Sequence, residues 1–478
     1  MRMQKNDNPQ ADGKQIPTES WIKANKFTNE SPDPTPPQFS DVALANRFAD
    51  KYGHKLRYVA SWGKWLIWDS TYWRFDDTMQ AFDMARDICQ SASAECNEHA
   101  VSRRIASAQT VAAVEKLARA DRRIAATVDQ WDNDPWLLNT PGGVIDLRTR
   151  TLRLQMATDY MTKITSVAPG GDCPIWADFL LKITANNDEL IAYLQRKAGY
   201  CLTGSTKEHD LDFFYGTGGN GKGVFLNTLT GIMNSYSAVA NVDSFTSSNN
   251  DKHPTDLAML RGARLVTAQE TEEGRRWAES RIKAVTGGDP ITARHMRQDF
   301  FTFIPQFKLV IAGNHRPALR NVDEAIRRRF HLVPFTVTIS DKERDKDLPE
   351  KLKAEWSGIL KWAIDGAKEW FESGLNPPPV VREATVKYLA DEDMLELWIT
   401  ERCMLGRGHT ATMSDLYSSW TEWCDGAGEM SGTMKAFSQN LRAKHTEFED
   451  WQCPTTRRLG LQGIQAIKSV ATHWSDNP

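Results

Sequence analysis

The chain has 478 residues, of which 40% are hydrophobic and 25% charged, as in an ordinary globular protein of about three domains. Its formal net charge of −3 excludes a uniformly basic nucleic-acid-binding surface, so any such site must be a local basic patch. The seven scattered cysteines form no C-x-x-C pair, and no long apolar run is present. We therefore expect a soluble, cytoplasmic protein with reduced thiols and no membrane partner.

The first part of the chain predicts a tail followed by a small domain. Residues 1–40 are polar and contain SPDPTPP at 31–37, which predicts a disordered tail. Residues 41–173 are expected to form an N-terminal α+β domain. It would contain a helix at 42–52, short strands between 58 and 75, one long arginine-rich helix at 79–126, and two strands around a turn at 138–154. A solvated helix face is the simpler reading of those arginines, with nucleic-acid contact as the alternative.

The rest of the chain predicts a helical collar, an α/β core and a C-terminal domain. Strong helical periodicity covers residues 176–200, and the collar and core together are expected to occupy residues 174–375. A further helix is predicted at 347–371. The prolines at 376–381 indicate a linker, and residues 383–478 predict a small α-rich domain with a strand pair near 456–466.

A glycine-rich segment, LDFFYGTGGNGKG at residues 211–223, is the most informative part of the sequence. A short apolar strand leads into a G-x-x-x-x-G-K turn, and an apolar-periodic helix follows, which is the setting of a phosphate-binding loop. Glycines allow backbone N–H groups to converge on phosphates, and the helix N-terminus adds its positive dipole end. The predicted nucleotide-binding residues are Gly216, Thr217, Gly218, Gly219, Asn220, Gly221, Lys222, Gly223 and Val224, with Lys222 reaching the β- and γ-phosphates.

The same glycines allow a second interpretation. Gly216, Gly218 and Gly221 also fit G-x-G-x-x-G, and Asp243 lies about where a dinucleotide-binding fold places its ribose contact. Lys222 after the last glycine favours a triphosphate instead. Gly223 occupies the position where a hydroxyl residue would ordinarily bind Mg²⁺, so this ligand is missing.

Two further apolar strands are predicted to end in polar residues. The segment RLVTAQE at 264–270 places Glu270 where an acid would activate the attacking water and help to hold Mg²⁺, although a glutamate at a strand end is common. The preceding position, where a metal-binding aspartate is usual, is Gln269. The strand at 307–312 leads to Asn314, which would contact the attacking water or the γ-phosphate, or would simply form a turn with Gly313.

Two basic segments complete the set of candidate residues. Arg328 and Arg329 precede the last apolar strand, and one of them could reach ATP bound by a neighbouring subunit; a solvated or DNA-facing turn is the alternative. Residues 287–304 predict a β-hairpin with a basic tip. Its candidate DNA-binding residues are Lys283, Arg294, His295 and Arg297.

Taken in order, GTGGNGKG, RLVTAQETEEG, KAVTGGDPITAR, FKLVIAGNHRP and AIRRRFHLVPF resemble the core of superfamily 3 helicases. The series is similar to the helicase half of phage and plasmid primase–helicases, which are related to poxvirus-type NTPase-primases. The similarity extends over roughly residues 41–470. It implies an α/β fold, with a P-loop AAA+ core, the α+β N-terminal domain and a small winged-helix-like C-terminal domain.

The resemblance also implies a function. It predicts an ATP- and Mg²⁺-dependent helicase that forms a homo-hexamer, moves along single-stranded DNA and unwinds forked DNA during replication of a phage, plasmid or integrated element in a bacterial cell. By position, Lys222 binds phosphate, Glu270 activates water and binds metal, Asn314 is a sensor, and Arg328 or Arg329 is an arginine finger. We expect no priming activity from the first 40 residues, so a separate primase is a possible partner. The alternative is an NTPase that only binds or melts an origin.

Overall fold

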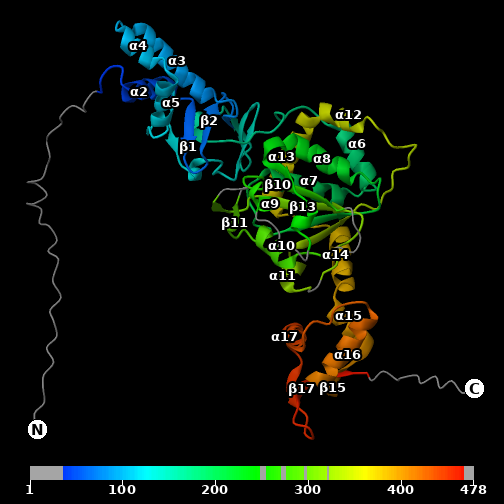
Figure 1. Ribbon diagram of the computed structural model, residues 1–478. Helices are drawn as coiled ribbons and strands as arrows, with labels where there is room; N and C mark the ends of the chain where they lie inside the picture. The colour runs from blue at the N-terminus through cyan, green and yellow to red at the C-terminus, as the bar shows by residue number, and fades with distance from the viewer. Residues whose placement is uncertain (1–35, 248–254, 271–275, 295–298, 320–321, 468–478) are drawn as a thin grey trace, which may run out of the picture. The chain divides into compact units, whose positions relative to one another are not determined.

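The computed structural model describes residues 36–247, 255–270, 276–294, 299–319 and 322–467 as a mixed α/β fold (Figure 1). These residues divide into two compact units, and each unit buries a hydrophobic core of its own. Among the described residues, the first unit comprises 36–67 together with Phe75–Thr127, and the second comprises Trp68–Arg74 and the described residues from Val128 to 467. Residues 1–35 of the predicted tail lie outside the described residues.

The first unit packs helices against a small sheet. Its helices are α2 (Asp41–Tyr52), α3 (Gln80–Glu95), α4 (His99–Ile105) and α5 (Ala108–Ala118), and its strands are β1 (Leu56–Val59), β2 (Lys64–Trp68) and β4 (Ala125–Ala126). β1 pairs antiparallel with β2 and parallel with β4. The prediction of one long helix at 79–126 is wrong, because Cys96 is extended and the Ser107 side chain accepts a hydrogen bond from the Thr110 backbone, which starts a new helix.

The second unit begins with a three-stranded meander rather than the two strands predicted at 138–154. Its strands are β5 (Leu137–Thr140), β6 (Gly143–Asp146) and β7 (Thr151–Arg153), while β3 (Trp73–Phe75) spans the sequence boundary between the units. Buried Arg264 donates hydrogen bonds to the carbonyl oxygens of Asp134 (3.2 Å) and Leu137 (2.8 Å). These bonds join the meander to the core that follows it in sequence.

Two long helices that the periodicity predicts are each divided in two. The predicted helix at 176–200 is α6 (Pro174–Ile183) followed by α7 (Asp188–Leu202), because Ala185 and Asn186 adopt positive φ values. The predicted helix at 347–371 is α12 (Leu348–Ala354) followed by α13 (Trp356–Ser373). Glu355, at this second break, accepts hydrogen bonds from the first N–H groups of α6, so the interruption caps a neighbouring helix.

A five-stranded parallel sheet forms the centre of the second unit. Its order is β14 (Phe330–Pro334), β8 (Leu211–Tyr215), β13 (Lys308–Gly313), β10 (Leu265–Glu270) and β9 (Ser237–Val239). All four neighbouring pairs are parallel, so the carboxyl ends of the strands share one edge of the sheet. In doubly wound α/β folds, that edge is where ligands bind.

Helices cover both faces of this sheet (Figure 1). Phe214 packs with residues of α8 (Lys222–Met233) and α13 in one core, whereas Phe213 packs with residues of α10 (Glu279–Thr286) and α11 (Glu324–Arg327) in another. Adjacent strand residues point to opposite faces, so this single strand contributes to two cores. The short helix α9 (Thr255–Ala258) also contributes to the second core.

The C-terminal part contains more regular structure than its sequence predicts. Its helices are α14 (Pro379–Asp391), α15 (Met394–Arg402), α16 (Met413–Gly426) and α17 (Met434–Lys444), and its sheet has the order β15 (Cys403–Thr412), β17 (Leu459–Ala466), β16 (Glu449–Gln452). The predicted linker at 376–381 already contains the first turn of α14, because proline is tolerated at a helix start. In the core of this part, Trp420 stacks on Phe437, and Trp398 meets both rings in an edge-to-face arrangement.

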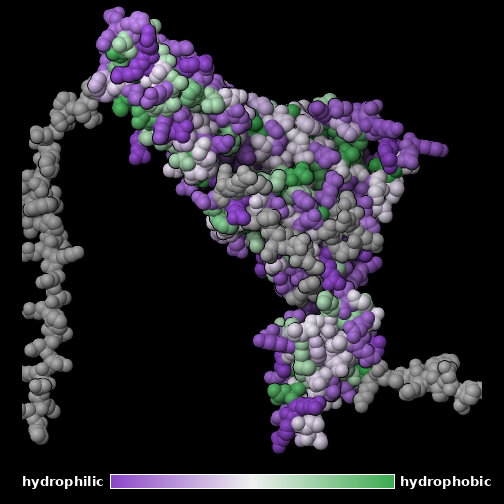
Figure 2. Space-filling view, viewed as in Figure 1, coloured by the Kyte–Doolittle hydropathy of each residue, from purple (hydrophilic) through white to green (hydrophobic). Residues whose placement is uncertain are grey.

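No described helix combines the length and the apolar character that crossing a membrane requires. On the face drawn in Figure 2, hydrophobic residues occur as scattered patches among hydrophilic ones. All seven cysteines lie within the described residues as free thiols, as the lack of a paired cysteine motif predicts.

Candidate functional site

The glycine-rich loop has the predicted strand–loop–helix setting. It leaves the central strand β8 after Tyr215 and enters α8 at Lys222. Gly221 has a φ of +85°, and a Cβ atom there would lie 2.4 Å from Ile183 of α6. At Gly216 a Cβ atom would lie 2.2 Å from the Phe335 carbonyl oxygen. The loop therefore requires glycine at both positions, for its backbone conformation and for close packing.

Asn220 holds the loop in shape. Its buried side-chain amide donates hydrogen bonds to the carbonyl oxygens of Thr217 (2.7 Å) and Phe335 (3.2 Å). The Ile339 backbone N–H donates to the Gly219 carbonyl at 2.9 Å. Bonds from both sides thus preorganise the loop without any ligand.

Lys222 and Asn314, which are 92 positions apart in the sequence, meet beside this loop. Lys222 is only 6% exposed, and its ammonium donates to the Gly216 carbonyl oxygen and, at 3.3 Å, to the Asn314 side-chain oxygen. Burial lowers the pKa of Lys222 to about 8. A buried ammonium with only neutral oxygen acceptors around it is a suitable partner for an anion.

The backbone of Glu270 lies at the same edge of the sheet. It is in register with Gly313 on β13, which is in turn in register with Tyr215 on β8. The side chain of Glu270 lies outside the described residues, so its predicted metal-binding and catalytic roles stay predictions. A Cβ atom at Gly223 would meet no atom within 4 Å, so the site has room for the hydroxyl side chain that the sequence lacks there.

The sheet order contradicts the dinucleotide interpretation. In a dinucleotide-binding fold, the ribose-binding acid follows the strand beside the glycine-loop strand. Here the strand that precedes Asp243 is β9, and β13 and β10 separate it from β8.

A cavity of about 300 Å³ adjoins the glycine-rich loop. It is lined by Gly219 and Gly221 and by two kinds of side chain. The apolar ones are Ile175, Phe179, Val224, Ile339 and Leu348, and the charged ones are Asp178, Lys182, Glu343, Arg344 and Asp345. Sequence reasoning did not identify this cavity, because its lining comes from α6, α8 and the segment around 339–348, which are distant in sequence. Its apolar walls suit a flat ring, and its charged lining residues carry both signs.

The two candidate finger arginines differ in their surroundings. Arg328 is exposed directly after α11, whereas Arg329 turns back and donates to the Ala325 carbonyl at 2.9 Å. Burial, reinforced by neighbouring Arg328, lowers the pKa of Arg329. Arg328 is therefore better placed than Arg329 to reach a group outside its own chain.

The predicted hairpin is confirmed, but its candidate DNA contacts are not all together. β11 (Ile291–Arg294) pairs antiparallel with β12 (Phe300–Phe303), and the Arg294 guanidinium lies 5.0 Å from the ring centre of Phe300, which is 60% exposed. Lys283 belongs instead to α10 and pairs with Asp323, the N-cap of α11. Its role in DNA binding stays a prediction, and DNA phosphates would compete there with Asp323. His295 and Arg297 lie outside the described residues.

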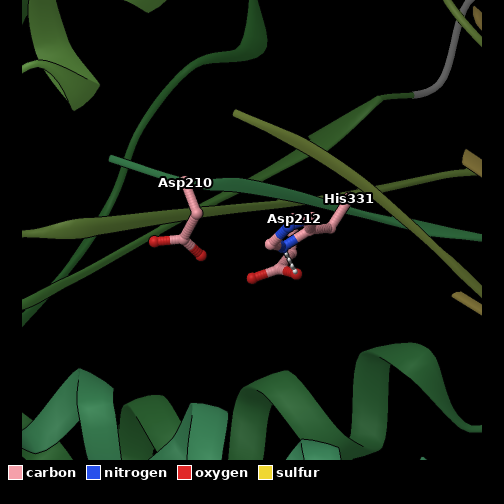
Figure 3. A group of neighbouring side chains, drawn as sticks. All are labelled: Asp210, Asp212 and His331. Atoms are coloured by element: carbon pink, nitrogen blue, oxygen red, sulfur yellow. Dashed lines mark ion pairs between the residues drawn. The ribbon is translucent and has the colours of Figure 1, made fainter. Parts of the chain in front are cut away.

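A buried charged cluster, which the sequence analysis missed, lies on β8, on the residue directly before it and on β14 (Figure 3). Asp210, Asp212 and His331 are close enough to bind one metal ion. The Lys197 ammonium, however, pairs with both carboxylates. Burial opposes ionisation of Asp212, but Lys197 and His331 together outweigh burial and lower the pKa of that carboxyl group. The Lys197 ammonium thus already occupies the place of a cation in this cluster. In the sequence, the only sign of the cluster was an acidic residue within the apolar strand LDFFY.

Two parts of the chain match known families. Residues 45–185 match the family described as "D5 N terminal like", and residues 214–329 match a family of unknown function, DUF5906. The chain is 24% identical over 321 residues to "Putative helicase L207/L206" of Acanthamoeba polyphaga mimivirus, covering 61% of this chain and 33% of that protein. These matches support a relationship to D5-like primase–helicases.

A second viral protein and one solved structure are also similar to this chain. "Putative helicase 184R" of Invertebrate iridescent virus 6 is 27% identical over 237 residues, which cover 47% of this chain and 24% of that protein. The chain thus spans about a third or less of the length of these relatives. The structure described as "The A form apo structure of NrS-1 C terminal region-CTR" aligns with 89% of this chain and 100% of that one, at 10% identity and a TM-score of 0.47.

Proposed function

We propose that the protein is an ATP-dependent DNA helicase with a P-loop AAA+ core of the superfamily 3 type and a winged-helix-like C-terminal domain. The observation that carries the proposal is the meeting of Lys222, Asn314 and the end of β10 at one edge of a parallel sheet. Similarity to viral proteins named as helicases supports it. The helix, strand, helix, helix, strand, strand order from α15 to β17 supports the winged-helix assignment.

The residues beside the loop fit a nucleoside triphosphate. The apolar walls of the adjoining cavity would hold the base, and the loop N–H groups and Lys222 would hold the phosphates. Asn314 would orient the attacking water, and Glu270 would accept its proton and help to hold Mg²⁺. When bound, the metal would neutralise charge on the phosphate oxygens. Arg328 of one subunit would stabilise the transition state at the next subunit of a homo-hexameric ring.

The buried Lys222 predicts a pH dependence of ATP binding. Phosphate oxygens favour the ammonium form and so raise its pKa in the complex above the value of about 8 in the free protein. Below pH 8, Lys222 carries its proton both in the free protein and in the ATP complex. Above pH 8, Lys222 of the free protein is mostly neutral, so ATP binding must be accompanied by the uptake of a proton. ATP affinity should therefore fall from pH 8 to pH 9 by up to about tenfold.

Isothermal titration calorimetry at pH 7 and pH 9, in buffers of different ionisation enthalpy, measures this proton uptake directly. The Lys222→Ala variant is the control, in which uptake above pH 8 should disappear. Equal affinity and no uptake at pH 9 would show that Lys222 does not pair with the phosphates.

The hairpin predicts a separable DNA-binding defect. Base stacking on an aromatic ring contributes about 1–3 kcal/mol, so Phe300→Ala should weaken single-stranded DNA binding by on the order of tenfold. Arg294→Ala should make the slope of log K for DNA binding against log salt concentration shallower by about 0.7, because one phosphate contact is lost. Both variants should keep the ATPase rate measured without DNA.

ATPase assays and unwinding of forked DNA test the function as a whole. Ile304→Ala, which truncates a 65% exposed apolar residue just beyond β12, is the matched control for Phe300. If Ile304→Ala and Phe300→Ala weaken binding equally, stacking is not the cause. Hydrolysis without strand displacement on any fork would favour the origin-melting NTPase over the helicase. A bacterial cytoplasmic setting and a separate primase belong to the same proposal.

A further inference from the structure

Three consecutive acidic residues, Asp391, Glu392 and Asp393, join α14 to α15 and contact segments that lead into the candidate site. Glu392 accepts a hydrogen bond from the Leu319 backbone N–H at 3.0 Å, and Asp391 lies 3.9 Å from Arg316. Leu319 and Arg316 both belong to the segment that follows Asn314. The end of α14 is thus fastened to the loop that carries the candidate sensor.

Asp393 makes the strongest of these connections. It is 3% exposed, and one of its carboxylate oxygens lies 3.1 Å from the guanidinium of Arg327, the residue directly before Arg328. Its other oxygen pairs with the ammonium of Lys444 at the end of α17 and caps α15 through the Glu396 N–H. A buried carboxylate with two cationic partners is costly to disturb, because loss of its charge leaves both cations without an anion.

Helix α11 is consequently held at both ends. Its N-cap Asp323 pairs with Lys283 of α10, and its last residue Arg327 pairs with Asp393. A helix of four residues has little stability of its own, so external contacts must set its direction. The direction of α11 in turn determines where exposed Arg328 points.

We propose that Asp393 is a positioning residue for the trans-acting Arg328: through Arg327 it orients the arginine turn and links that turn to α17 of the C-terminal part. This inference rests on the proposed ring ATPase. According to this inference, Asp393 sets the position of the Arg328 side chain that acts at the neighbouring subunit, and it does not affect the nucleotide site of its own subunit.

The Asp393→Asn variant tests this directly, since it keeps the size and the capping oxygen and removes the charge. We expect kcat for ATP hydrolysis to fall by about 10–100-fold, as small misplacements of catalytic groups do, with KM changed by less than about twofold. Arg327→Gln, on a more exposed side chain, should have a similar effect with little risk to folding. The double variant should be no worse than the worse single variant. Asp450→Asn, which removes the exposed carboxylate that pairs with Arg442 and lies away from the candidate site, is the matched control.

A mixing experiment provides a readout that a merely structural role would not change. Lys222→Ala subunits have a defective loop but an intact arginine turn, so they should restore hydrolysis to Arg328→Ala subunits, and equally to Asp393→Asn subunits. Full activity of Asp393→Asn alone would overturn the inference. A second result would also overturn it: Lys222→Ala subunits restore hydrolysis to Arg328→Ala subunits but fail to restore it to inactive Asp393→Asn subunits. If Arg328→Ala is not rescued either, the trans-acting arginine itself is wrong; absence of wild-type hydrolysis would instead overturn the proposed function.

Discussion

Replacing Lys222 with alanine is expected to lower the rate of ATP hydrolysis by on the order of 10²–10³-fold or more, because the change removes a preorganised charge from the site where negative charge accumulates. The fold should remain, since within the described part of the chain the Lys222 ammonium donates hydrogen bonds to only the Gly216 carbonyl and the Asn314 side chain, and Lys222 is not a member of the hydrophobic cores on either face of the sheet. Steady-state ATPase measurements, with circular dichroism to verify folding, check both parts of the prediction.

The control for this variant is Lys346→Ala, which removes an exposed lysine from the loop before α12. It should have the activity of the wild type. Because burial disfavours the Lys222 ammonium in the free protein, Lys222→Ala should melt at the same temperature as the wild type or higher. Hydrolysis at the wild-type rate would overturn the phosphate-binding role of the loop.

Replacing Arg328 with alanine is expected to leave ATP binding unchanged and to reduce hydrolysis by about 10³-fold or more, the range known for arginine fingers. The arginine would act on charge that develops in the transition state, so its loss should lower kcat without raising KM. Arg382→Ala, on the exposed side of α14, is the control for loss of a surface guanidinium. ATP titrations and single-turnover hydrolysis separate binding from chemistry.

The Arg328 prediction also concerns assembly. If the arginine acts between subunits, the specific activity of the wild type should rise with protein concentration as rings form, and mass photometry with ATP and DNA should detect the assembly. A monomer that hydrolyses ATP at the same specific rate at all concentrations would exclude a trans-acting arginine.

Local sequence patterns were sufficient to predict the glycine-rich loop. The apolar run at 211–215, the glycines and the periodic segment after Lys222 act over a few residues, so the strand, the turn and the helix could be predicted together. The hairpin between β11 and β12 was predictable for the same reason. Long helices were predicted less well, because the interruptions at Ser107, Ala185 and Glu355 depend on caps, positive φ values and neighbouring helices.

The tertiary structure decided which distant residues meet. Only the order of the parallel sheet places β13 between β8 and β10, and so brings Asn314 to Lys222 and excludes a ribose contact by Asp243. Ion pairs across the fold connect Lys283 to Asp323 and Asp393 to Arg327. Charge and periodicity in a sequence report the chemistry of a side chain and the face on which it lies. Its partners come from elements tens to hundreds of residues away, and only the packed sheet and helices determine which of them come within a few ångströms.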